Sequence, residues 1–162
     1  MKLYSFKTQQ IIPIPIEEAW DFFSSPHNLS RITPEHMNFR ILSEIPPKVY
    51  PGMIITYKVT PVAPFTTGWV TEITQVNTPQ FFIDEQRFGP YAFWHHQHHF
   101  KEVPQGTEVM DLVHYGIPGG FIGRFAHWLF VKRQLNAIFE YREAALINLF
   151  GTPDLKTEIA QA

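Results

Sequence analysis

The sequence predicts an α+β protein in which an antiparallel sheet of seven strands wraps around one long C-terminal helix. Patterns occur in the order of one strand, two short helices, six strands and one long amphipathic helix. The strand–helix–strand alternation typical of a parallel sheet is missing from this order. A single long helix buries its apolar stripe by lying across one face of the sheet. We therefore expect a helix-grip arrangement with room for a ligand between sheet and helix.

The N-terminal third predicts the first strand and the two short helices. Residues 3–14 alternate imperfectly and predict a strand. Pro15 marks a helix start with two glutamates in the first turn, where carboxylates favour the positive end of the helix dipole. Residues 24–26 end this helix, and a second short helical turn is expected over residues 28–34.

Strand patterns continue through the middle of the chain. Three strands are expected around residues 39–41, 53–59 and 66–76. A proline-rich break at residues 61–64 separates the last two of these, and residues 77–79 predict a turn.

Residues 81–118 predict three further strands, joined by tight turns at Gly89-Pro90 and at residues 104–107. Side chains two apart on a strand point to the same face. If the second turn closes with Val103 opposite Glu108, one face carries aromatic rings with polar groups set among them. In that pairing Phe100 lies opposite Asp111, His98 opposite Val113, and His96 opposite Tyr115, with Trp94 on the same face.

The C-terminal helix is expected over residues 121–150. Apolar residues recur at helical spacing along it, with one interruption around Lys132 and Arg133, which we interpret as a solvated patch. Gly151 followed by Pro153 predicts its end. We expect residues 1–150 to form a single domain and residues 151–162 to form a mobile tail.

Composition narrows the classes of function. The 162 residues carry a net charge of −2, which gives no electrostatic reason to expect nucleic acid or an anionic membrane as a partner. The chain has no cysteine. It has neither an apolar run of signal-peptide length nor one of about 20 residues. We therefore expect a cytoplasmic location and no insertion in a membrane. Charged residues make up 17% against about 25% in typical domains, whereas 15% are aromatic, which favours a chain that lines a cavity or an interface.

The two histidines of the central strand allow two interpretations. His96 and His98 share a face, and this spacing can hold zinc if a neighbouring strand supplies a third ligand, for which Asp111 is the nearest candidate. The alternative is that both are hydrogen-bonding side chains in a cavity wall. We favour the second interpretation, so neither a metal nor another cofactor is expected.

Two further places in the chain can contribute charged residues to the space between sheet and helix. Residues 84–87 place either Asp84 and Gln86 or Glu85 and Arg87 inward, because the loop at Gly89-Pro90 leaves the hairpin register undetermined. Arg142 lies in the apolar stripe of the long helix, where an arginine usually has a carboxylate partner. We favour an internal salt bridge with Asp84, Glu85 or Asp111 over an anchor for a ligand carboxylate or phosphate.

A set of motif residues spreads over residues 1 to about 150: Pro15, Ala19, Trp20, Phe22, Phe23, Thr33, Pro34, Gly68, Trp69, residues 84–86 and 89–91, Trp94, His96, His98, Phe100, Asp111, Val113, Tyr115, Pro118, Phe139, Tyr141 and Arg142. With these residues the chain resembles the START/Bet v 1-like superfamily, also called SRPBCC or polyketide cyclase/dehydrase and lipid transport proteins. More narrowly, the pattern is similar to an uncharacterised bacterial ligand-binding subfamily. The resemblance implies a hydrophobic cavity between sheet and helix and does not identify the ligand.

We predict that the protein binds an apolar or amphipathic small molecule, lipid-like or polycyclic, in that cavity as a monomer or weak homodimer. The predicted ligand-binding residues are Trp69, Gln86, Trp94, His96, His98, Phe100, Asp111, Val113, Tyr115, Phe125, Leu129, Phe139 and Arg142. The alternative is a cyclase or dehydratase with His96 or His98 as general base and Asp84 or Asp111 as its orienting partner. A third hypothesis is an accessory domain that contacts a partner protein through aromatic side chains.

Overall fold

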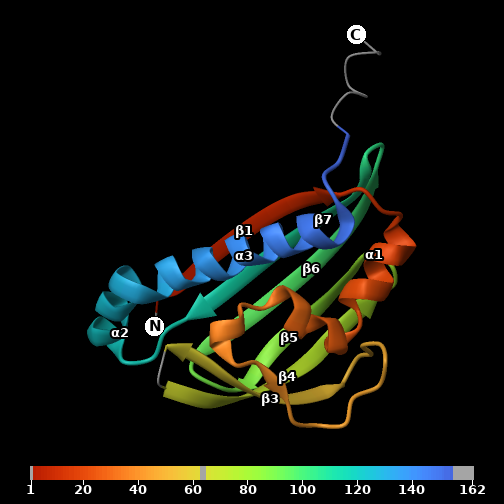
Figure 1. Cartoon of the computed structure of the whole chain (residues 1–162). Helices are drawn as coiled ribbons and strands as arrows, with labels where there is room; N and C mark the ends of the chain where they lie inside the picture. Colours follow the sequence, from red (N-terminus) through yellow and green to blue (C-terminus); the bar gives the residue numbers. More distant parts are fainter. Residues whose placement is uncertain (1, 63–64, 155–162) are drawn as a thin grey trace.

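A seven-stranded antiparallel sheet and a long C-terminal helix across one of its faces form the chain, as seen in a computed structural model that describes residues 2–62 and 65–154 (Figure 1). The strand order is β1-β7-β6-β5-β4-β3-β2, so β1 joins the last strand and the rest of the sheet is a meander. The predicted fold class is confirmed. The elements are β1 Leu3–Ile12, α1 Ile16–Phe23, η1 Pro26–Ile32, η2 Glu35–Met37, β2 Arg40–Ile41, β3 Ile54–Val62, β4 Phe65–Asn77, β5 Phe81–Phe88, β6 Phe93–Val103, β7 Gly106–Gly116, α2 Gly120–Ala126, η3 His127–Val131 and α3 Lys132–Phe150.

Strand β3 runs further than the sequence indicated. It continues through Pro61 to Val62, although a break was expected from residue 61 onward. A proline fits there because β2 pairs only with Tyr57 and Lys58, which leaves the rest of β3 at the sheet edge, where a missing N–H costs no ladder bond. Residues 63–64 and 155–162 lie outside the described residues, and with them the rest of the predicted break and most of the predicted tail.

The turn between β6 and β7 is tighter than the pairing considered from the sequence. Val103 pairs with Gly106 rather than with Glu108, because only Pro104 and Gln105 form the turn. His98 therefore lies opposite Asp111, His96 opposite Val113, and Trp94 opposite Tyr115. A shift of two residues leaves every side chain on its predicted face and changes only its partner.

The C-terminal helix contains a π-helical segment that the sequence pattern did not reveal. This segment, η3, ends at Val131, next to the interruption that the pattern showed at Lys132 and Arg133, both of which are exposed. An extra residue in one turn rotates everything before it relative to the stripe on α3. Phe125 and Leu129 are consequently exposed, at 61% and 43%, and His127 is buried in their place.

Buried charged residues separate two apolar clusters on the inner face. Along β6 the side chains pass from Trp94 in one cluster, through His96 and His98, to Phe100 in the other. Strand β7 repeats the order with Asp111 between Val113 and Val109, and α3 repeats it with Arg142 between Phe139 and Leu146. Three elements thus place their polar residues at one level of the core.

Within the described residues, no helix has the length and apolar character needed to cross a membrane.

Candidate functional site

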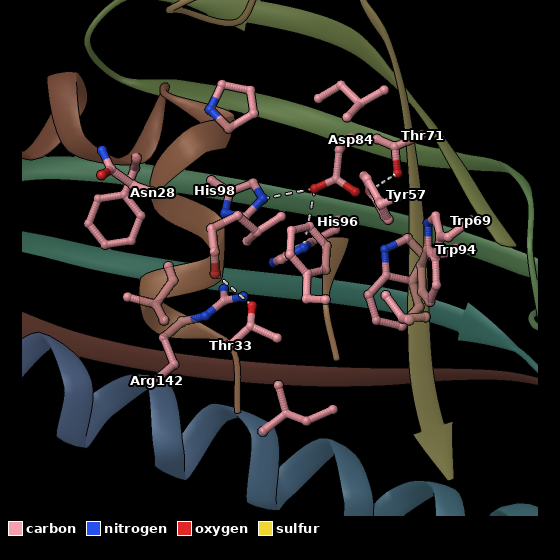
Figure 2. A pocket seen from close by; sticks show the side chains of 18 of the residues that line it. Asn28, Thr33, Tyr57, Trp69, Thr71, Asp84, Trp94, His96, His98 and Arg142 are labelled. Carbon is pink, nitrogen blue, oxygen red and sulfur yellow. Dashed lines mark hydrogen bonds and ion pairs between the residues drawn. The ribbon is translucent and has the colours of Figure 1, made fainter. Parts of the chain in front are cut away.

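A cavity of about 180 Å³ lies between the inner face of the sheet, the short helices after β1, and α3. Its wall is mostly apolar, and its charged groups come from β5, β6 and α3. Figure 2 shows Asp84, His96 and His98 in this wall with Arg142 on the helix side. The sheet contributes Ile55, Tyr57, Val59, Trp69, Thr71, Ile73, Phe82, Asp84, Trp94, His96 and His98, α3 contributes Leu135, Ile138, Phe139 and Arg142, and η1 and η2 contribute Leu29, Ile32 and Met37.

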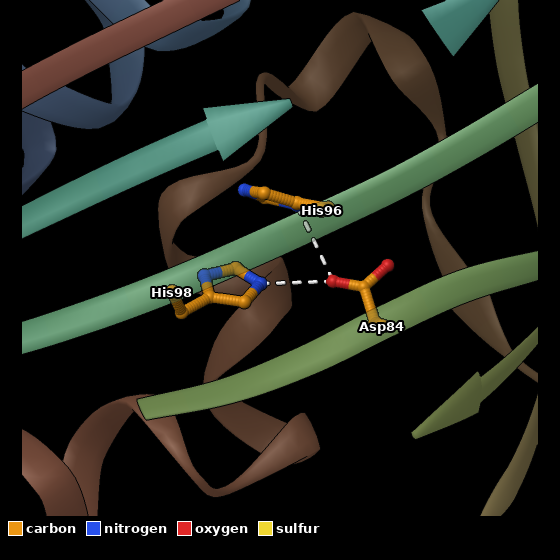
Figure 3. A group of neighbouring side chains, drawn as sticks. All are labelled: Asp84, His96 and His98. Atoms are coloured by element: carbon orange, nitrogen blue, oxygen red, sulfur yellow. Dashed lines mark hydrogen bonds and ion pairs between the residues drawn. The ribbon is translucent and has the colours of Figure 1, made fainter. Parts of the chain in front are cut away.

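One carboxylate oxygen of Asp84 contacts both histidines. Its Oδ2 accepts a hydrogen bond of 2.8 Å from Nε2 of His98 and lies 3.3 Å from Nδ1 of His96. Figure 3 shows the two imidazoles converging on this one carboxylate oxygen. The ring centroids of the histidines are 3.8 Å apart. The three side chains offer ligand atoms that all lie within 4.8 Å of one another, so they could hold a metal ion.

Asp111 approaches the same two rings from β7. Its Oδ1 accepts a 2.8 Å hydrogen bond from Nε2 of His96 and lies 2.9 Å from Nδ1 of His98. Nδ1 of His98 lacks hydrogen-bonding geometry to this oxygen and has no hydrogen-bond partner among the described residues. Nη1 of Arg142 lies 3.4 Å from the same oxygen, which confirms an internal salt bridge between the long helix and the sheet.

Opposite charges keep this cluster ionised despite its burial. Burial disfavours the charged forms, yet the charge and hydrogen bonds of His96 and His98 hold the pKa of Asp84 well below its usual value. Burial likewise opposes ionisation of Asp111, and the Arg142 guanidinium with both histidines lowers its pKa. For His96, burial is outweighed by the negative charge of Asp84 and by hydrogen bonds to Asp111 and Asp84, so its pKa rises to about 9. At neutral pH two carboxylates therefore face the positive charges of His96 and Arg142.

Two tyrosines of the cavity wall stay neutral. Burial, followed by the charge of Asp84, raises the pKa of Tyr57 far above its usual value, against the hydrogen bond that links its hydroxyl to Thr71. Burial and the neighbouring Tyr115 also raise the pKa of Tyr91. These phenols act only as neutral hydrogen-bonding groups at ordinary pH.

The structure brings some of the predicted site residues to the cavity and leaves others elsewhere. Trp69, Trp94, His96, His98, Phe139 and Arg142 line it. Phe100, Val113 and Tyr115 are instead buried in the apolar clusters, and Asp111 lies behind the histidines. The side chain of Gln86 forms hydrogen bonds with the backbone of Tyr91. Phe125 and Leu129 are exposed on the C-terminal helix. The expectation that Phe125 and Leu129 face the cavity is wrong because of the π-helical segment before α3. A ligand-binding role for the remaining residues stays a prediction.

Several lining residues were not among those predicted. Ile55, Tyr57 and Val59 alternate along β3 and could have been found from that pattern, as could Leu135 and Ile138 from the helical stripe. Residues of η1 and η2, such as Met37, carry no such signal because short 3₁₀ turns lack a long period.

The outward-facing histidines of β6 take no part in the cavity. Nδ1 of His95 lies 2.8 Å from Oε1 of Glu85, and Nε2 of His99 bonds to Oε1 of Gln97 at 2.9 Å. The alternative left open for residues 84–87 is thereby resolved: Asp84 points inward, whereas Glu85 and Arg87 form an ion pair on the outer face.

Comparison with known proteins identifies the fold. No protein-family model and no curated protein matches the sequence. Solved structures do match it over nearly the whole chain. Protein CV1439 from Chromobacterium violaceum shares 12% identity with a TM-score of 0.69, covering 91% of this chain and 97% of that one. Protein TTHA0849 from Thermus thermophilus shares 13% identity with a TM-score of 0.67, covering 90% and 99%.

The Bet v 1 allergen Ara h 8.0201 also matches, with 13% identity, a TM-score of 0.57, and coverage of 91% of this chain and 99% of that one. The chain therefore has the Bet v 1-like (SRPBCC) fold, as its motifs predicted. At such identities the likeness concerns the fold alone, because one fold serves many functions.

Proposed function

We propose that the protein binds a small apolar or amphipathic molecule in the cavity between the sheet and α3. The observation that carries the proposal is the union of an apolar cavity with a buried charged cluster in its wall. Ligand sites are typically apolar enclosures with a few polar groups that fix orientation. Here Asp84, His96, His98 and Arg142 are those groups.

The cavity volume supports a ligand smaller than a long lipid or a polycyclic compound. Drug-sized ligands occupy pockets of about 300–1,000 Å³, whereas an apolar cavity of about 150 Å³ takes up benzene. A cavity of about 180 Å³ suits one or two rings or a short acyl chain. The apolar body would lie against residues such as Ile55 and Leu135.

Two donors in the wall support a ligand that carries an acceptor group. Nε1 of Trp69 and Nε of Arg142 are buried without a hydrogen-bond partner among the described residues. An unsatisfied buried donor costs about 1–3 kcal/mol, so an acceptor brought by a ligand gains that amount. A carbonyl or carboxylate oxygen has the required chemistry.

The cyclase or dehydratase alternative is not favoured with His96 as its general base. A general base has to be unprotonated at working pH. His96 is bonded to Asp111 and lies beside Asp84, and these carboxylates raise its pKa to about 9. At neutral pH it already holds the proton that a base would have to accept.

Titration calorimetry with benzoate and octanoate as probes tests the proposal. The matched variants are Ile55→Trp, which fills the cavity, and Ile54→Trp, which adds the same ring to an exposed position next to it on β3. We expect wild type and Ile54→Trp to bind at least one probe and Ile55→Trp to lose at least tenfold in affinity. Equal affinity in both variants, or no binding of either probe by the wild type, would overturn the proposal.

Two finer expectations accompany the proposal. A monomer or weak homodimer is expected because the ligand is the only partner that the cavity requires, and sedimentation analysis measures this. A cytoplasmic location is expected from the sequence, and fractionation of cells that produce the protein tests it.

A further inference from the structure

We propose that Asp84, His96 and His98 form a binding site for one divalent first-row transition-metal ion. On the sequence alone, Asp111 was the nearest third ligand, and no metal was expected. The structure brings both carboxylates to the histidines. Asp84, which pairs with His96 across β5 and β6, is the one that lines the cavity. Two imidazoles and one carboxylate are a donor set that suits zinc and its neighbours in the first row.

The spacing of the donor atoms fits such an ion. Two ligands of a tetrahedral ion at about 2.1 Å lie about 3.4 Å apart. Oδ2 of Asp84 and Nδ1 of His96 are 3.3 Å apart, and Oδ2 of Asp84 and Nε2 of His98 are 2.8 Å apart. Of these two distances only the second has to open, by about half an ångström, and the ligand atoms of the two histidines lie within 4.8 Å of each other. All three side chains lie on strands, which hold them in place.

Asp111 supplies the outer carboxylate that metal-bound histidines usually have. A histidine that binds a metal through one ring nitrogen normally directs the other to a carboxylate or carbonyl. Nε2 of His96 donates to Oδ1 of Asp111 at 2.8 Å, and Nδ1 of His98 lies 2.9 Å from the same oxygen. Arg142 in turn holds Asp111 at 3.4 Å. Each histidine thus has one nitrogen toward Asp84 and the other toward Asp111.

The free side of the site faces the cavity. Asp84, His96 and His98 line the cavity, whereas Asp111 does not. With neutral histidines, a dication and Arg142 against two carboxylates leave one excess positive charge, so the open coordination position favours an anionic oxygen. The metal site goes beyond the proposed function and does not depend on an organic ligand.

Metal binding is tested on protein treated with a chelator and then titrated with Zn²⁺ by calorimetry. We expect one ion per chain. Asp84→Asn and His98→Gln should each lower the affinity at least 100-fold, and Asp111→Asn should lower it about 10- to 100-fold, as outer-shell changes do. The controls are His95→Gln and His99→Gln, which change histidines of the same strand on its outer face and should leave the affinity within about twofold of wild type.

Cobalt absorption of the wild-type protein gives a second readout that needs no variant. Co²⁺ in the site should show the intense visible bands of a four- or five-coordinate ion, and Zn²⁺ should abolish them. Loss of Zn²⁺ binding in His95→Gln or His99→Gln, retention in His98→Gln, or only the weak bands of six-coordinate Co²⁺ would overturn the proposal. Benzoate and octanoate titrations in the presence of chelator keep this result separate from that of ligand binding.

Discussion

Asp84 and His96 lie directly opposite each other on β5 and β6, with 3.3 Å between Oδ2 of the carboxylate and Nδ1 of the ring. This pair belongs to a charged cluster in which Asp111 on β7 contacts His96 and Arg142 on α3 contacts Asp111. Sheet and helix are therefore joined by charge at the level where the cavity interrupts the apolar core. The same groups that we propose to orient a ligand thus contribute to stability.

Removing Arg142 should destabilise the protein strongly. Arg142→Met leaves the buried Asp111 without its guanidinium partner, and breaking a buried pair costs about 3–5 kcal/mol in the free energy of unfolding. Arg87→Met is the matched control, because Arg87 pairs with Glu72 at 2.5 Å but its side chain is 44% exposed. Such a surface pair contributes at most about 1 kcal/mol. Urea denaturation measures both values, and equal losses would show that the histidines alone satisfy Asp111.

Alkaline pH should weaken the cluster in metal-free protein. The pKa of His96 on β6 is raised to about 9. The charged and titratable groups around it are Asp84 on β5, Asp111 on β7, His98 on β6 and, beyond Asp111, Arg142 on α3. A group whose pKa is raised by folding stabilises the protein fully below its unfolded value of about 6.5. That contribution is lost as pH rises toward about 9.

At acidic pH the carboxylates give stability the opposite dependence on pH. The depressed pKa values of Asp84 and Asp111 stabilise the fold above about pH 4, and this contribution is lost as pH falls through their folded values. Denaturation of the wild type and of His96→Gln, in chelator and from acidic to alkaline pH, measures the loss of stability on both sides. The stability difference between the two proteins should shrink from pH 6.5 to 9, and a constant difference would contradict a protonated His96.

Gly106 should tolerate no side chain. Its φ of +131° favours glycine, and an added Cβ would overlap the backbone oxygen of Ile12 and lie 2.8 Å from Cα of Pro13. We expect Gly106→Ala to lose about 2 kcal/mol or more in thermal or urea unfolding. Gly68→Ala is the control, since nothing lies within 4 Å of a Cβ there. Similar stability of the two variants would mean that the β6–β7 turn relaxes easily.

The sequence was sufficient to predict the fold because hydrophobic period and turn residues act locally. Alternation along β6 put His96 and His98 on one face, and the same reasoning placed Asp111 and Arg142 with them. A register shift of two residues keeps each side chain on the same face of the sheet. The residues predicted to point inward were therefore right, whereas the predicted partner of His98 was wrong.

The remaining parts depend on geometry that no local pattern encodes. The register of β5 against β6 is fixed by a loop whose length the sequence left open, and Asp84 therefore remained one of two inward candidates. The π-helical segment shifts the helical phase by one residue without a proline or glycine inside it, so Phe125 and Leu129 were placed on the wrong face. The cavity wall from η1 and η2 depends on tertiary packing alone.

Native mass spectrometry tests most directly the claim that the cavity holds a small molecule. The purified protein is measured before and after incubation with benzoate or octanoate, in chelator, and its denatured mass serves as the reference. The proposed function predicts an excess mass of one small molecule, carried from the producing cells or taken up from the probe, that disappears on denaturation and is not seen with Ile55→Trp. A native mass equal to the denatured mass under every condition would contradict ligand binding.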